Sequence, residues 1–95
     1  MPLRLVINGA GGRMGQRLVA LGSADPDLNI VAALEYASHP KLGTDAGTIA
    51  GVGEIGVPLA RSFNVQADAV IDFSDSFSII IRHQPNFQDV VVSYF

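Results

Sequence analysis

Four glycines lie close together near the start of the chain, in the stretch LVINGAGGRMG at residues 5–15. Gly9, Gly12 and Gly15 have G-x-x-G-x-x-G spacing, and Gly9, Gly11 and Gly15 form a variant of the dinucleotide fingerprint. Where a strand leads directly into a helix, several backbone N–H groups lack partners and favour an anion. Glycine lets this backbone approach a phosphate closely, because no β-carbon intervenes. The spacing therefore predicts a phosphate-binding turn, and an ordinary flexible turn is the alternative.

Two side chains that follow these glycines also bear on the predicted site. Arg13 falls at the start of the expected helix, where its charge opposes the helix dipole. Such a charge is favourable if a pyrophosphate binds there, whereas the alternative is a solvated surface arginine. We expect the Met14 side chain to lie in the core, with its backbone N–H facing the phosphate.

An acidic residue stands at the position that a dinucleotide site requires. Glu35 ends the second apolar run, about 20 positions after Gly15. A carboxylate there accepts hydrogen bonds from the hydroxyls of the adenosine ribose, and its charge repels a 2′-phosphate. The alternative is a charged residue that merely ends a strand.

These residues need a strand, a turn, a helix and a second strand to position them. Residues 3–7 (LRLVI) form an apolar run that fits a strand buried on both faces. Met14, Leu18 and Leu21 have helical spacing and predict the buried face of a helix that Gly22 closes. Residues 29–34 (NIVAAL) predict the second strand. Such a unit must be parallel, because a helical crossover returns the chain beside its first strand.

The rest of the chain predicts fewer regular elements. We expect a loop over residues 35–62 with one helical turn near residues 45–50, and a short edge strand at residues 57–59. Residues 69–73 (AVIDF) predict a third buried strand, and residues 90–94 are a candidate fourth. The predicted fold class is α/β, a Rossmann-like half-fold with a parallel sheet of three to four strands and one main crossover helix.

Composition excludes several other classes of protein. The chain has 95 residues, 48% of them hydrophobic, and a net charge of −3, which gives no electrostatic reason to bind nucleic acid or an anionic membrane. No apolar run approaches the roughly 20 residues of a membrane span, and no signal peptide is evident, so we expect a cytoplasmic protein. There is no cysteine, and His39 and His83 lack the spacing of a metal site, so we predict surface histidines and no bound metal.

Four blocks of sequence, in order, resemble dihydrodipicolinate reductase, also called 4-hydroxy-tetrahydrodipicolinate reductase. They are INGAGGRMGQ, DPDLNIVAALE, LGTDAGTIAGVGEIGV and ADAVIDFS. The resemblance covers about residues 3–74 and implies the opening part of that enzyme's cofactor domain. The family reduces a cyclic diacid in lysine and diaminopimelate synthesis, with hydride from NADH or NADPH.

The resemblance also implies which residues bind the cofactor. Glu35 would contact the adenosine ribose, and Phe73 and Ser74 would lie near the cofactor. Tyr36 stands where many members have an arginine or lysine, which favours NADH over NADPH because tyrosine cannot neutralise a 2′-phosphate. Lys41 could compensate, so use of both cofactors stays open. The residues implied to line the pyrophosphate are Gly9, Ala10, Gly11, Gly12, Arg13 and Met14.

After Ser74 the sequence departs from the family pattern. The family continues with a proline where this chain has Ser76, then with a G-T-T-G loop over the nicotinamide. Its second domain carries an H-H-x-x-K-x-D motif, which supplies a general acid and a lysine near the substrate. Residues 75–95 contain neither motif. We therefore expect residues 1–74 to be the N-terminal part of a dinucleotide-binding domain and residues 75–95 a divergent tail, truncated or frameshifted. We expect no catalytic residue, and the diacid would bind only with the second domain present.

Three alternatives stay open at this point. The chain could be a stand-alone module that binds a dinucleotide without turnover. It could be a fragment that does not fold alone, because its sheet has long unpaired edges; pairing with another chain, or with a second copy as a homo-oligomer, would relieve this. It could also belong to a sugar dehydrogenase of the same fold, although GGRMG and GTDAG disfavour this.

Overall fold

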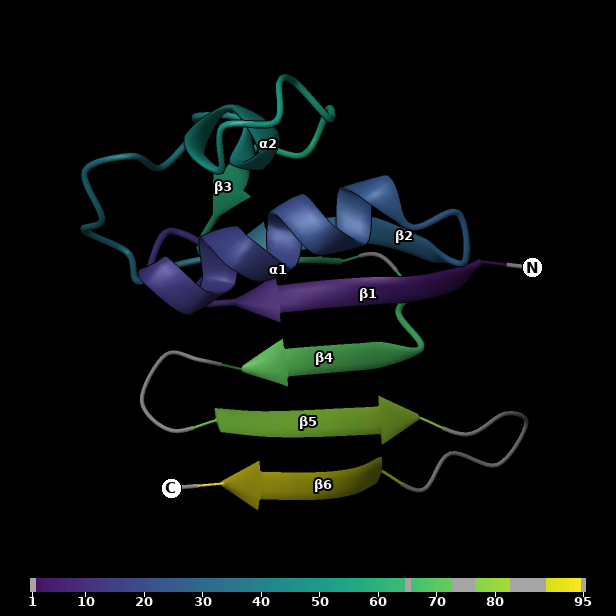
Figure 1. The fold of residues 1–95 in the computed structure, drawn as a ribbon. Coiled ribbons are helices and arrows are strands. Elements are labelled where there is room, and N and C mark those ends of the chain that lie inside the picture. The colour runs from purple at the N-terminus through teal and green to yellow at the C-terminus, as the bar shows by residue number, and fades with distance from the viewer. Residues whose placement is uncertain (1, 65, 73–76, 83–88, 95) are drawn as a thin grey trace.

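A single mixed sheet with helices packed on it makes up the fold (Figure 1). The computed structural model describes residues 2–64, 66–72, 77–82 and 89–94. Eight elements follow one another along the chain: β1 (Leu3–Asn8), α1 (Arg13–Ala24), β2 (Leu28–Leu34), α2 (Ala46–Ile49), β3 (Leu59–Ala60), β4 (Ala69–Asp72), β5 (Phe77–Arg82) and β6 (Asp89–Tyr94).

The order of the strands is β3-β2-β1-β4-β5-β6, and the first four of these are parallel. This confirms the predicted α/β half-fold with a parallel sheet. Asn8 pairs with Leu34 on one side and with Asp72 on the other, so β1, β2 and β4 end at the same level. The chain leaves β1 toward β2 on one side and later reaches β4 on the other, which makes this edge a topological switch point.

The last two strands differ from the expectation for the tail. Residues 90–94 do lie in a strand, β6, but it pairs antiparallel with β5, which itself pairs antiparallel with β4. The apolar triplet in residues 79–81 was not predicted as a strand. Residues 73–76 are too few for a parallel return, which needs a crossover of about a dozen residues. The chain after β4 can therefore extend the sheet only in the antiparallel sense.

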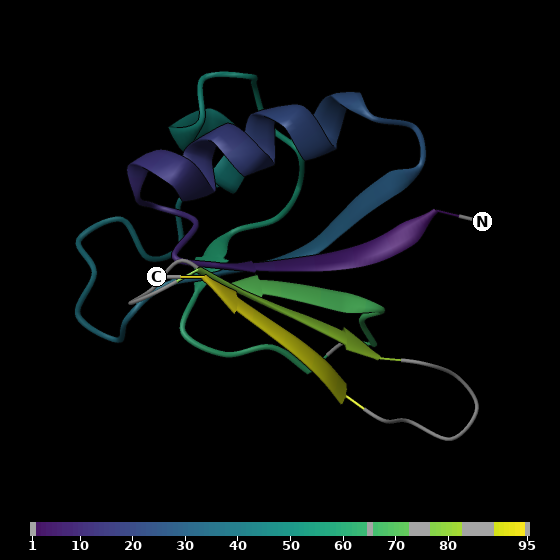
Figure 2. The same cartoon turned by 60° about the horizontal axis from the view of Figure 1, so that its bottom comes forward.

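Apolar side chains cover both faces of β1, as its unbroken apolar run predicts. Leu5 and Ile7 face α1 and join the larger core cluster, which includes Val19 of α1. Val6 points to the opposite face, is fully buried and packs with Leu34. Both helices lie on the same face of the sheet, and α1 runs over β1 and β2 (Figure 2).

The face that α1 buries is not the predicted one. Gly15, Val19 and Gly22 are buried, whereas Met14 and Leu21 are 54% and 67% exposed. The expectation of a core Met14 is therefore wrong. Gly15 lies on the buried face because the backbone of α1 there comes very close to the turn that follows β1.

Gly22 does not end the helix as predicted. The helix continues to Ala24, and Gly22 packs against Ile30 of β2. A β-carbon at Gly22 would lie 3.1 Å from Ile30 Cδ1, so this glycine serves close helix–sheet contact. Leu18 packs partly buried against the core, as its spacing predicts.

Asp45 organises the long loop between β2 and β3. Its carboxylate caps the predicted helical turn by accepting the N–H of Thr48, and it also accepts the N–H groups of Ile55 and Val57 at 2.9 Å. Partial burial raises the pKa of Asp45, but these hydrogen bonds outweigh burial and leave the pKa below its usual value. The predicted edge strand at residues 57–59 forms as β3, which covers Leu59–Ala60.

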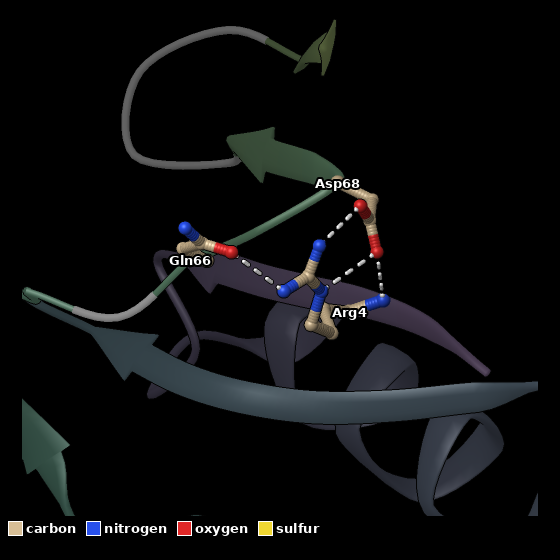
Figure 3. Close-up of polar contacts among 3 residues, drawn as sticks. All are labelled: Arg4, Gln66 and Asp68. Carbon is tan, nitrogen blue, oxygen red and sulfur yellow. Dashed lines mark hydrogen bonds and ion pairs between the residues drawn. The ribbon is translucent and has the colours of Figure 1, made fainter. Parts of the chain in front are cut away.

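An ion pair ties the amino end of β1 to the segment before β4 (Figure 3). The Arg4 guanidinium donates to both carboxylate oxygens of Asp68 and to Gln66 Oε1, and the Arg4 backbone N–H also donates to Asp68. The side-chain and backbone hydrogen bonds from Arg4 lower the pKa of Asp68 to about 2. This pairing lies at the end of the sheet opposite the glycine turn and fixes β1 beside β4.

Candidate dinucleotide site

The glycine turn connects the carboxyl end of β1 to α1. Gly9 has a φ of 83°, a left-handed conformation that favours glycine. The N–H groups of Gly9 and Ala10 both donate to the Leu34 carbonyl, at 2.9 and 3.1 Å, and Gly12 N–H donates to the Gly9 carbonyl. The turn is therefore held against the end of β2 by its own backbone.

The first N–H groups of α1 remain available for an anion. Gly12 is the N-cap, has no side chain to cap the helix, and accepts from Gln16 N–H. Within the described part of the chain, the N–H groups of Arg13, Met14 and Gly15 have no hydrogen-bond acceptor. Three donors at a helix start, together with the positive end of the helix dipole, make an arrangement that suits an anion.

Gly15 permits the tight approach on which this geometry depends. A β-carbon at Gly15 would lie 2.1 Å from the Gly9 carbonyl oxygen and 2.6 Å from Ala10 Cα. Both are backbone atoms, so no side-chain rotation could relieve the contact. Gly15 therefore allows α1 to pack tightly against the glycine turn.

Glu35 follows β2 and reaches the glycine turn. Its Oε2 accepts the N–H of Gly11 at 2.9 Å, and its own backbone N–H donates to Ala60 of β3. The side chain is half-buried. The structure thus brings together the two segments that the sequence assigned to pyrophosphate and ribose.

Arg13 and Met14 both extend from the outer surface of α1. Arg13 is exposed and lines a hollow between α1 and Ala50, with Met14 and Arg17 also on its wall. The Arg13 guanidinium is therefore at the helix start with solvent access, where an anionic ligand could pair with it.

The sequence predicts Tyr36 beside the cofactor but His39 on the surface, away from the glycine turn. The structure brings His39 to that turn, because a β-carbon at Gly11 would lie 2.8 Å from His39 Nε2. The two rings meet edge to face, with centroids 5.0 Å apart. The sequence signals for this contact are an aromatic residue directly after Glu35 and a histidine three positions after that.

One further acidic residue, Asp72, lies at the margin of this region. Asp72 ends β4 beside Asn8 and is half-buried. Phe73, Ser74 and His83 lie outside the described residues.

Among the residues that the structure describes, no three His, Asp or Glu side chains gather as metal ligands. No helix in that part of the chain is both long enough and apolar enough to cross a membrane.

The strand order, the glycine turn after β1 and the acid after β2 together define a nucleotide-binding unit of the Rossmann type. Comparison with known families narrows this class. A sequence model described as dihydrodipicolinate reductase, N-terminus, matches residues 3–84. The chain therefore belongs to the dihydrodipicolinate reductase family and corresponds to the N-terminal part of its members.

Curated relatives agree with this assignment. The chain is 44% identical over 78 residues to a 4-hydroxy-tetrahydrodipicolinate reductase of Rhodopirellula baltica, covering 77% of this chain and 28% of that protein. It is 43% identical over 76 residues to the enzyme of that name from Sinorhizobium medicae, covering 76% and 28%. For the Anaeromyxobacter dehalogenans enzyme the identity is 41% over 83 residues, covering 84% and 30%. The chain spans less than a third of the length of these relatives.

Proposed function

We propose that these 95 residues are the NAD(P)H-binding portion of a 4-hydroxy-tetrahydrodipicolinate reductase. The reaction would be reduction of a cyclic diacid by hydride from the bound dinucleotide. The observation that carries the proposal is the contact between Glu35 Oε2 and the N–H of Gly11, at the carboxyl edge of the parallel sheet. It brings the acid proposed to bind the ribose to the turn proposed to bind the phosphates, at the place where such sheets bind dinucleotides.

The binding roles follow from the groups at this edge. The pyrophosphate would accept hydrogen bonds from the first N–H groups of α1, and Arg13 would add a charge-assisted contact. The backbone of Gly9, Ala10 and Gly12 would line the phosphates. Two of these residues have no side chain and the third has only a methyl group, so nothing bulky would keep the phosphates away. Glu35 would accept from the adenosine ribose hydroxyls.

We propose NADH as the preferred cofactor. Glu35 places a negative charge where a 2′-phosphate would lie, and the next residue, Tyr36, carries no compensating charge. Tyr36 is 61% exposed, so its side chain is directed toward solvent beside the site. Use of NADPH would depend on a cation from elsewhere, such as the exposed Lys41.

These residues by themselves are proposed to bind the cofactor without carrying out the reduction. The relatives named as reductases are more than three times as long as the segment they share with this chain. Groups that orient the substrate or deliver a proton are each typically worth about a hundredfold or more in rate. Steady-state turnover of the cyclic diacid by the 95-residue chain at an ordinary enzymatic rate would contradict this proposal.

Replacement of Glu35 by glutamine tests the cofactor site. We expect Glu35→Gln to weaken NADH by about tenfold or more, because a hydrogen bond to a charged group is worth about 1.5–3 kcal/mol. NADPH should lose less, since the same change removes repulsion of its 2′-phosphate. Amide NMR titrations of both cofactors give the dissociation constants and show which amides shift.

Glu54→Gln provides a matched control. It removes the same charge from an exposed position in the loop after α2, and should leave both dissociation constants unchanged. Equal losses of NADH and NADPH in Glu35→Gln would remove Glu35 from the cofactor site. Shifts confined to residues away from the glycine turn would refute the proposed location.

A further inference from the structure

His39 is held in a fixed orientation beside the glycine turn. Its Nδ1 accepts the backbone N–H of Lys41 at 3.1 Å, and its backbone N–H donates to the Tyr36 carbonyl at 3.0 Å. The Tyr36 ring meets the imidazole edge to face, with an interplanar angle of 66°. The imidazole is half-buried. Such restraints on a side chain in a loop favour a positioned group over a solvated surface histidine.

The hydrogen bond to Nδ1 determines which ring nitrogen carries the proton. A neutral imidazole that accepts at Nδ1 must donate from Nε2. Nε2 also points toward Gly11: a β-carbon built on that glycine would lie 2.8 Å from Nε2 and 3.1 Å from Glu35 Oε2. A donor from His39 and an acceptor from Glu35 therefore lie close together on the same side of Gly11, where a ligand atom above that glycine could contact both.

A hydroxyl group matches such a pair, because it donates one hydrogen bond and accepts others. A phosphate ester oxygen is an acceptor at neutral pH, so it would satisfy His39 but be repelled by Glu35. The arrangement therefore selects a ribose hydroxyl over a phosphorylated one.

We propose that His39 is a specificity-determining residue of the dinucleotide site. Its Nε2–H donates to the adenosine ribose hydroxyl whose proton Glu35 accepts. This rests on the proposed function, because it assumes that the ribose lies beside Glu35. Gly11 is part of the same arrangement, since a β-carbon there would enter the space between His39 and Glu35.

The test combines a change in the protein with a change in the ligand. The 95-residue chain, His39→Phe and His39→Gln are titrated with NADH and with its 2′-deoxy and 3′-deoxy adenosine-ribose analogues. His39→Phe should weaken NADH by about five- to tenfold, which corresponds to one hydrogen bond. The loss of affinity should disappear for the deoxy analogue that lacks the hydroxyl group contacted by His39. Glutamine retains an N–H donor, so His39→Gln should recover part of the affinity.

A second measurement does not depend on any variant. A long-range ¹H–¹⁵N spectrum of the wild-type imidazole should show the Nε2–H tautomer, and its Nε2 resonance should shift when NADH binds. The opposite tautomer, or an equal loss for NADH and both deoxy analogues in His39→Phe, would overturn the role of His39. If a variant loses its dispersed amide spectrum, the wild-type spectrum still tests the tautomer of His39 and its response to NADH.

The wild-type titration separates the two proposals. If NADH shifts the amides of Gly11 and Glu35 but His39 substitutions do not alter affinity, only the role of His39 fails. If the wild-type chain does not bind NADH, the proposed function fails and the role of His39 fails with it.

Discussion

Replacement of Gly15 by alanine should destabilise the chain markedly, although alanine is the better helix former. Within a helix, Gly→Ala gains up to about 1 kcal/mol from propensity. At Gly15 the new β-carbon would lie 2.1 Å from the Gly9 carbonyl oxygen and 2.6 Å from Ala10 Cα. Nonbonded atoms of this kind rest roughly 3.5–4.0 Å apart, so α1 or the turn would have to move by roughly 1 Å or more.

The magnitude follows from the nature of the neighbouring atoms. Overpacking typically costs about 1–3 kcal/mol, and we take the upper end because both neighbours of the Gly15 β-carbon are backbone. With the propensity gain included, Gly15→Ala should lose about 2 kcal/mol. Gly22→Ala, in the same buried face of α1, meets only the flexible end of Ile30 at 3.1 Å and should be close to neutral or slightly stabilising.

Urea unfolding of the two alanine variants measures this difference directly. The shared propensity gain cancels, so the comparison isolates the contact with the glycine turn. We expect Gly15→Ala to be less stable by about 2–3 kcal/mol, or roughly 10–20 °C in melting temperature for a domain of this size. If Gly15→Ala is within about 0.5 kcal/mol of Gly22→Ala, the close approach of α1 to the turn is not present in solution.

Two further predictions concern the loop cap and the ion pair. Asp45→Ala should lower the free energy of unfolding by about 2 kcal/mol or more, because the backbone N–H groups of Ile55 and Val57 lose their acceptor. Hydrogen exchange of these two amides should become faster by a larger factor than exchange of the amides in the sheet. The folded pKa of Asp68, about 2, lies below its unfolded value, so the Arg4 pairing stabilises fully above about pH 4 and is lost as the pH falls toward 2. The urea midpoint of the wild type should therefore fall more steeply over this range than that of Asp68→Asn, and parallel curves for the two would contradict the assignment.

Local signals were sufficient to predict the elements that form the site. The apolar run before the glycines, the helical stretch after them and the second apolar run gave β1, α1 and β2 nearly at their observed bounds. The helical turn after Asp45 was also predicted, because an N-cap acts on residues only a few positions away. The distance along the chain between the glycines and Glu35 was enough to place the acid at the sheet edge.

Distant contacts determined what the sequence left open. His39 joins the glycine turn through a loop whose path depends on Asp45 and on pairing with β3, and no local pattern encodes that path. The antiparallel direction of β5 and β6 follows from sheet geometry after β4 rather than from any feature of their apolar triplets.

The sequence by itself determined the class of this protein: a strand, a glycine turn, a helix and an acid in dinucleotide-binding order. Only the tertiary structure decided which face of α1 is buried. Hydrophobicity favoured Met14 and Leu21, but both are exposed, and Gly15 and Gly22 lie inside. The physical reason is distance: α1 lies so close to the backbone of the glycine turn at Gly15, and to the Ile30 side chain at Gly22, that a missing β-carbon contributes more to packing than a large apolar side chain.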